Sequence, residues 1–168
     1  METKFKLFGH PVHPMLVVFP LGLLSTAVVF DLLYLATGND ELAVAAFWVI
    51  AVGVIGGLLA AAFGLWDWLG IPKDTRAKRV GLLHGGGNVV VTGLFAVSWL
   101  LRLGDPTYLP DNILPLVLGL VGVGIALFTA WLGGELVYRL RVGVDDGAGL
   151  NAPSSMSGTG LADVDRPT

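Results

Sequence analysis

The second apolar stretch of the chain, residues 42–69, reads LAVAAFWVIAVGVIGGLLAAAFGLWDWL and contains a single charged side chain, Asp67. A helix needs about 20 predominantly apolar residues to cross the hydrocarbon core of a bilayer. Residues 42–69 exceed that length, whereas helices of soluble proteins average about 11–12 residues. The stretch therefore predicts a membrane-spanning helix.

Three further stretches are long and apolar enough to cross a membrane. They cover about residues 14–37, 80–103 and 114–140. The segments between the four spans are short and contain Gly, Pro, Asn or Asp, which end helices and form turns. Short loops make each helix run opposite to the one before it. We therefore predict an all-α fold, an integral membrane antiparallel four-helix bundle.

The predicted chain has three parts. Residues 1–13 form a lead-in to the first helix, residues 14–143 form the four-helix domain, and residues 144–168 form a tail. The tail is rich in Gly, Ser, Ala and Pro and has little apolar surface to bury, so we expect it to be disordered. A cleaved signal peptide is not expected, because the first apolar run is too long and contains Asp31.

The composition excludes several classes of protein. Hydrophobic residues make up 54% of the chain, charged residues 14%, and the mean hydropathy is +0.76, whereas soluble domains carry about 25% charged residues. The net charge of −3 offers no basic surface for nucleic acid. Because cysteine is absent, disulfides and thiolate-bound iron–sulfur clusters are excluded. No hydrolase, transferase or nucleotide-binding motif is present, which leaves open whether the protein is an enzyme.

Basic residues predict which ends of the helices face the cytoplasm, because Lys and Arg gather in cytoplasmic segments. Eight of them precede the first span, separate the second from the third, or follow the fourth: Lys4, Lys6, Lys73, Arg76, Lys78, Arg79, Arg139 and Arg141. The opposite loops contain Arg102 and four acidic residues: Asp40, Glu41, Asp105 and Asp111. We therefore expect both termini in the cytoplasm.

Polar residues of all four spans are predicted to form a layer near the cytoplasmic boundary. The layer contains His13, Asp67, His84, Asn88 and Glu135. An ionisable residue inside a span costs about 2.5–3.5 kcal/mol on insertion scales, so its presence indicates a functional site. His84 and Asn88 are four positions apart and therefore share one helix face.

Residues 9–14 read GHPVHP, so both histidines of this segment precede a proline. A proline disfavours the helical conformation of the residue before it, which predicts extended geometry for His10 and His13. Imidazoles held in this way suit a metal ion or a haem iron. A purely structural alternative is that His13 caps the first helix or bonds to Asp67 or Glu135.

Three glycines, residues 85–87, follow His84 and predict that another group approaches closely there. That group is either a flat cofactor such as haem, with His84 as an axial ligand, or a neighbouring helix. At the other end of the spans, Asp31 and Arg102 are expected to form a stabilising pair.

These motifs resemble the family called domain of unknown function 2231, which comprises bacterial and archaeal membrane proteins. The resemblance covers residues 5 to about 144 and rests on the GHPVHP segment, FPLG at residues 19–22, WLGGELVY at residues 131–138, and Asp31, Asp67, Arg79, His84 and Asn88. It implies a multi-pass protein of the prokaryotic inner or plasma membrane. Related domains occur beside Rieske-type or cytochrome-type domains, which implies a redox neighbourhood.

Three functions remain open from the sequence, and haem binding is the most specific. A b-type haem-binding electron-transfer protein would use His84 and either His13 or His10 as axial ligands. Asn88, Asp67 and Glu135 would tune the iron, or would meet the propionates through Arg79. The expected partners are the lipid bilayer and a redox partner or a second copy of the chain, with no nucleic acid.

The other two functions need no haem. A zinc or iron ion would take its ligands from the histidines and carboxylates: His10, His13, His84, Asp67 and Glu135. In the last alternative the bundle has no cofactor, and its polar layer fastens the helices or docks a partner subunit, so that the protein acts as a scaffold.

Overall fold

The computed structural model describes residues 2–3, 5–109 and 111–156. Lys4, which contributes to the predicted orientation, and residues 157–168 of the predicted tail lie outside the described residues. Four helical segments are long and apolar enough to cross a membrane: Val12–Thr37, Asp40–Gly70, Arg76–Leu100 and Leu114–Arg139. The prediction of four apolar spans is therefore confirmed.

A small hairpin precedes the first span. Strand β1 (Lys6–Leu7) pairs antiparallel with strand β2 (His10–Pro11), and Leu7 lies opposite His10. Phe8 and Gly9 between them have positive φ angles of 50° and 82°, as two-residue hairpin turns require. His10 is therefore extended, as its place before a proline predicts.

The first span consists of two helices, α1 (Val12–Leu16) and α2 (Val18–Thr37). Pro20 lacks an amide hydrogen, so the carbonyl of Leu16 loses its usual helical partner where the two helices meet. His13 lies inside α1, which corrects the prediction that it precedes the first helix in extended geometry. Pro14 is tolerated in the first turn of α1. The first amides of a helix have no hydrogen-bond partner within the helix, so the missing amide hydrogen of Pro14 removes no helical bond.

The other spans begin at polar caps or loops. In α3 (Asp40–Gly70) the side chain of Asn39 accepts a hydrogen bond from the Glu41 amide. In α4 (Arg76–Leu100) the side chain of Thr75 caps the first turn in the same way. Such caps satisfy amides that have no helical partner. The last span joins α5 (Leu114–Gly134) to a π-helical turn, η1 (Glu135–Arg139).

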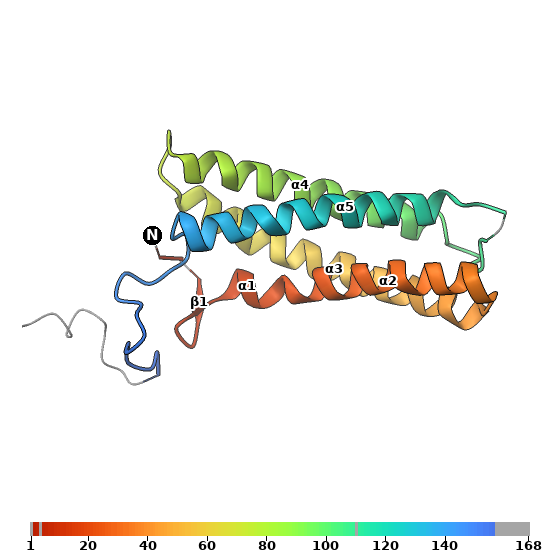
Figure 1. Ribbon diagram of the computed structural model, residues 1–168, viewed down its shortest axis with the longest axis horizontal. Coiled ribbons are helices and arrows are strands. Elements are labelled where there is room, and N and C mark those ends of the chain that lie inside the picture. The colour runs from red at the N-terminus through yellow and green to blue at the C-terminus, as the bar shows by residue number, and fades with distance from the viewer. Residues whose placement is uncertain (1, 4, 110, 157–168) are drawn as a thin grey trace, which may run out of the picture.

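The four spans pack against one another along the long axis of the molecule (Figure 1). Helix α2 packs chiefly on α3, and α4 packs on α5, while α3 also contacts α1 and α4, and α5 contacts α2. One group of buried apolar residues forms the main core: Leu24, Ala27, Val28, Ala46, Ile50, Val91 and Phe95. Glycines permit close packing there, since a Cβ on Gly122 would lie 2.7 Å from the Phe95 ring.

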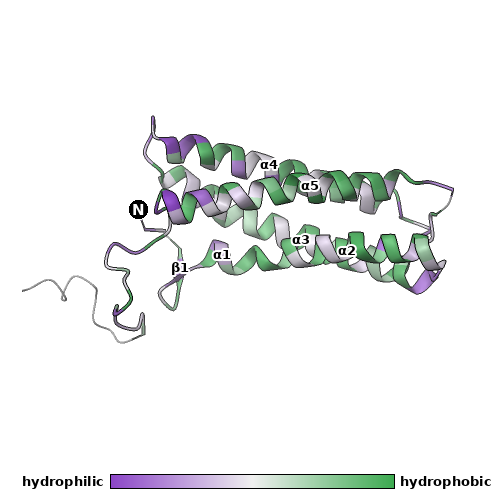
Figure 2. Ribbon diagram, viewed as in Figure 1, coloured by the Kyte–Doolittle hydropathy of each residue, from purple (hydrophilic) through white to green (hydrophobic). Residues whose placement is uncertain are grey.

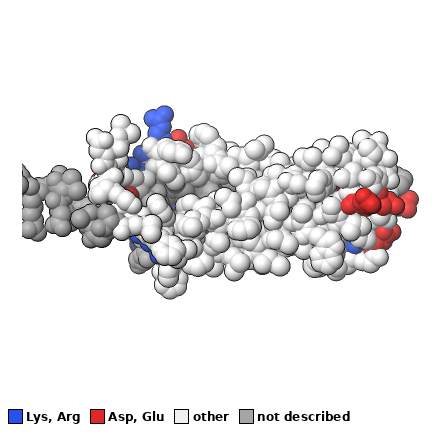
Figure 3. Space-filling view, turned by 90° about the horizontal axis from the view of Figure 1, so that it is seen from below, with Lys and Arg blue, Asp and Glu red and all other residues white. Residues whose placement is uncertain are grey.

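The helices are apolar along most of their length, as the colouring in Figure 2 shows. Large side chains such as Trp48, Leu58, Leu83 and Leu127 are all about 60% exposed or more. On the face shown in Figure 3, charged atoms gather at the two ends and are absent from the middle. A surface of this kind matches a lipid environment, because hydrocarbon does not solvate charge.

Candidate functional site

Two imidazoles from different spans approach each other in the polar layer. The rings of His13 on α1 and His84 on α4 have centroids 6.5 Å apart, and their planes cross at 88°. Helix α3 packs against both helices that carry them. We call His13 and His84 the histidine pair.

A backbone carbonyl of a neighbouring helix orients each ring of the histidine pair. The Nδ1 atom of His13 donates to the Ala60 carbonyl on α3 at 2.8 Å, and Nδ1 of His84 donates to the Thr129 carbonyl on α5 at 2.8 Å. Because a carbonyl only accepts, Nδ1 carries the hydrogen, and in a neutral ring Nε2 is left with its lone pair. Histidines that bind metals are typically oriented by such bonds.

Glycines allow both rings to lie directly on neighbouring helices. A Cβ on Gly64 would lie 2.7 Å from Cε1 of His13, and one on Gly133 would lie 3.1 Å from Cε1 of His84. In the glycine run after His84, a Cβ on Gly87 would collide with the Thr129 side chain of α5. A Cβ on Gly85 or Gly86 would have no such neighbour within 4 Å. The close approach predicted at this run is thus an approach of α4 to α5, made at its third glycine.

Asn88 connects His84 to the last span. Its amide nitrogen lies 3.3 Å from Nε2 of His84 and donates to the His84 carbonyl at 3.0 Å, while its amide oxygen accepts from the Thr129 hydroxyl at 2.9 Å. Thr129 is 2% exposed and was missed by the sequence analysis. The one feature of the sequence that could have indicated Thr129 is its position as a polar residue in the fourth span, several residues before Glu135.

Among the remaining predicted site residues, His10, Glu135 and Arg79 make no hydrogen bond to the histidine pair within the described part of the chain. His10 is exposed in the hairpin, with Nε2 3.5 Å from the Ser155 hydroxyl. Glu135 accepts from Arg76 at 2.7 Å, and Arg79 is exposed. Asp67 is 9% exposed near the end of α3.

The structure does not assemble the His/carboxylate set into one centre. Among residues 2–3, 5–109 and 111–156, no three His, Asp or Glu side chains come close enough to hold a metal ion. What the structure brings together from the predicted layer is two imidazoles and the amide of Asn88.

A separate polar cluster lies at the other end of the bundle and confirms the predicted Asp31–Arg102 pair. The guanidinium donates to both carboxylate oxygens at 2.7 Å, and the two side chains are at most 1% exposed. Arg102 also donates to the Ser98 hydroxyl, which in turn donates to the Pro115 carbonyl. The Tyr108 ring covers the guanidinium at 4.6 Å, and burial raises the pKa of the Tyr108 phenol.

Four packed apolar helices with charges at their ends define an integral membrane protein. Over residues 9–146 the chain matches the family model described as "Predicted membrane protein (DUF2231)", so it belongs to that family, and the resemblance seen in the sequence is confirmed. No curated protein and no solved structure shows significant similarity to the chain.

Proposed function

We propose that this membrane protein binds one b-type haem through His13 and His84 and transfers electrons with it. The observation that carries the proposal is the histidine pair itself. Two spans supply one imidazole each, and in both rings a carbonyl holds Nδ1, which leaves Nε2 as the nitrogen that would bind the iron. Facing helices of four-helix bundles commonly supply cofactor ligands in this way.

The separation of the rings supports a shared metal ion. Two imidazoles that coordinate one ion at about 2 Å each hold their ring centres roughly 6 Å apart. The observed separation is 6.5 Å. The amide of Asn88 would have to give up its contact with Nε2 of His84, and its two other hydrogen bonds would keep it next to the ligand.

The number of ligands favours haem over a bare ion. A protein zinc site needs three or four side-chain ligands, and the described residues provide no such group. A haem would need only one or two ligands from the protein, and when bound it would supply one-electron chemistry at its iron. The exposed Arg79 lies five residues before His84, at the start of the same helix, and would meet the propionates from there.

We also infer that the spans form an antiparallel bundle with both termini in the cytoplasm of a prokaryotic cell. Two contacts support this arrangement: Trp68 near the end of α3 donates to the Lys78 carbonyl in the first turn of α4, and Arg76 at the start of α4 meets Glu135 after α5. The basic residues of the described chain flank these same ends, apart from the buried Arg102, and such ends face the cytoplasm.

Absorption spectroscopy of the full chain, expressed with haem available and purified in detergent, tests the haem proposal. We expect a red protein with a sharp visible band that moves on reduction. His13→Ala and His84→Ala should each abolish or strongly alter the band, because each removes a side chain that would hold the iron. His10→Ala is the matched control, since His10 lies in the hairpin, and it should keep the wild-type spectrum.

Two outcomes would reject the haem proposal in favour of the alternatives. A colourless wild-type protein that contains zinc or iron by elemental analysis, and loses it in His84→Ala, would indicate an ion site. A colourless, metal-free protein in which His13→Ala and His84→Ala only lower the melting temperature would indicate a bundle whose polar layer fastens the helices.

A further inference from the structure

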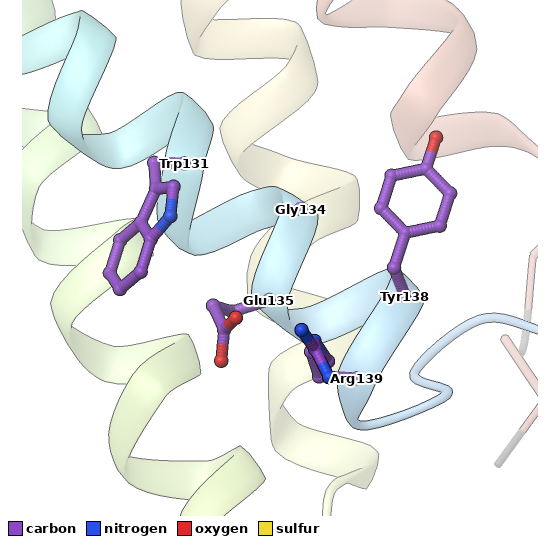
Figure 4. A pocket seen from close by; sticks show the side chains of 5 residues that line it. All are labelled: Trp131, Gly134, Glu135, Tyr138 and Arg139. Carbon is purple, nitrogen blue, oxygen red and sulfur yellow. The ribbon is translucent and has the colours of Figure 1, made fainter.

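A pocket of about 250 Å³ opens on the outside of the last span. Residues of the last turns of α5 and of η1 line it: Trp131, Gly134, Glu135, Tyr138 and Arg139 (Figure 4). The pocket lies at the end of a span that runs from Leu114 to Arg139, and therefore at the depth where hydrocarbon gives way to headgroups.

The local backbone shapes this pocket. Gly134 has no side chain at its base, and a Cβ there would meet only the Tyr138 ring, at 3.9 Å. The turn beyond Gly134 is π-helical, and the Leu140 amide donates to the Glu135 carbonyl five residues earlier at 3.0 Å. Single π-helical turns within α-helices are frequent at functional sites, because the wider turn displaces side chains from the regular helical pattern.

The charge around the pocket is positive once its acidic residue is paired. Glu135 is the one acid among the lining residues and is bound by Arg76 at 2.7 Å. Arg139 lines the pocket and is exposed. The three formal charges of Glu135, Arg76 and Arg139 therefore sum to +1, which favours an anion.

Two exposed aromatic rings flank the pocket. Trp131 is 60% exposed and Tyr138 is 84% exposed, and the Trp131 ring is held by stacking on Phe128, with centroids 6.1 Å apart. Trp and Tyr side chains are enriched at membrane interfaces because one end is apolar and the other polar. A ligand here would meet acyl chains on one side and water on the other.

We propose that this pocket binds the phosphate headgroup of an anionic phospholipid from the surrounding bilayer. Arg139 makes the charge-assisted contact to the phosphate, and Trp131 and Tyr138 flank the glycerol and upper acyl chains. The proposal is independent of haem binding, because none of these residues contacts His13 or His84 through a hydrogen bond or a ring contact shown by the structure.

Native mass spectrometry of the full-length protein in detergent, titrated with phosphatidylglycerol or phosphatidylcholine, tests the proposal. We expect the wild type to retain phosphatidylglycerol in preference to phosphatidylcholine. Arg139→Gln should weaken phosphatidylglycerol binding about five-fold, since a basic residue near anionic lipid contributes about 1 kcal/mol. Lys73→Gln removes one positive charge from the exposed loop at the same end and should bind like the wild type.

A second variant and a competitor complete the test. Gly134→Leu places a bulky side chain at the base of the pocket and should reduce retention while Arg139 stays in place. Equal retention of the two lipids by the wild type, or equal losses in Arg139→Gln and Lys73→Gln, would overturn the proposal. Displacement of bound phosphatidylglycerol by millimolar inorganic phosphate would also overturn it, because the site would then recognise a free anion.

Discussion

At the scale of single residues, Asp31 and Arg102 form a bidentate ion pair with almost no exposure. Removing one partner of such a pair leaves the other charge buried and uncompensated, which is more costly than the pair is stabilising. Because Arg102 also bonds to Ser98, and Ser98 to the Pro115 carbonyl, this cluster ties α2, the end of α4 and the start of α5 together.

Asp31→Asn should therefore destabilise the protein by about 3–5 kcal/mol, the range found when one partner of a buried pair is removed. The melting temperature in detergent micelles measures the effect. The control is Asp111→Asn, which changes an exposed acid of the loop at the same end and should melt like the wild type. A double variant, Asp31→Leu with Arg102→Leu, should lose less than Asp31→Asn. An unchanged melting temperature in Asp31→Asn would contradict the structural role of the pair.

At the scale of elements, α4 and α5 are joined by the bond from the Thr129 hydroxyl to Asn88 and by the bond from His84 to the Thr129 carbonyl. Gly87 brings the two backbones close enough for both bonds, because any side chain there would collide with Thr129. Gly87, the third glycine after His84, therefore allows α4 to pack closely against α5.

Thr129→Val keeps the size of the side chain and removes the hydroxyl, so it should lower the free energy of unfolding by about 0.6–1.7 kcal/mol, as for other hydrogen bonds between membrane helices. Detergent melting curves would show the change. Thr92→Val is the control, because the Thr92 hydroxyl bonds the Asn88 carbonyl within its own helix. If both variants melted alike, the link between α4 and α5 would not contribute to stability.

At the scale of the whole molecule, the described charges are distributed unequally between the two ends of the bundle. Residues 73–79, where the chain passes from α3 into α4, carry four basic side chains and one acid, and Arg139 and Arg141 lie at the end of the last span, whereas the segments around Asp40 and Asp105 are acidic. The face in Figure 3 shows the largest group of acidic atoms at one end of the molecule. This asymmetry underlies the orientation that we infer.

The absence of native cysteine makes that orientation directly measurable. Single variants Lys73→Cys and Asp111→Cys place a thiol in an exposed loop at each end. A membrane-impermeant maleimide added to intact cells should label Cys at position 111, and label position 73 only after permeabilisation. The opposite pattern would place both termini outside the cytoplasm.

Several features of this protein were determined by the sequence itself. Span length and apolarity act locally, so four helices could be predicted from composition and loop residues alone. The ion pair of Asp31 and Arg102 could also be predicted, because a charge in an apolar span needs a partner. The histidines were recognised as site residues for the same reason, since polar groups are rare in this chain.

The tertiary structure decided which of these polar residues meet. Membrane helices are apolar towards lipid and towards each other, so the sequence pattern carries little information about how each helix is rotated. Rotation and axial shift determine that His13 meets His84, that Thr129 meets Asn88, and that Glu135 instead meets Arg76. A displacement of a few ångströms along the helices would change each of these contacts, which is why only the packed bundle defines the histidine pair.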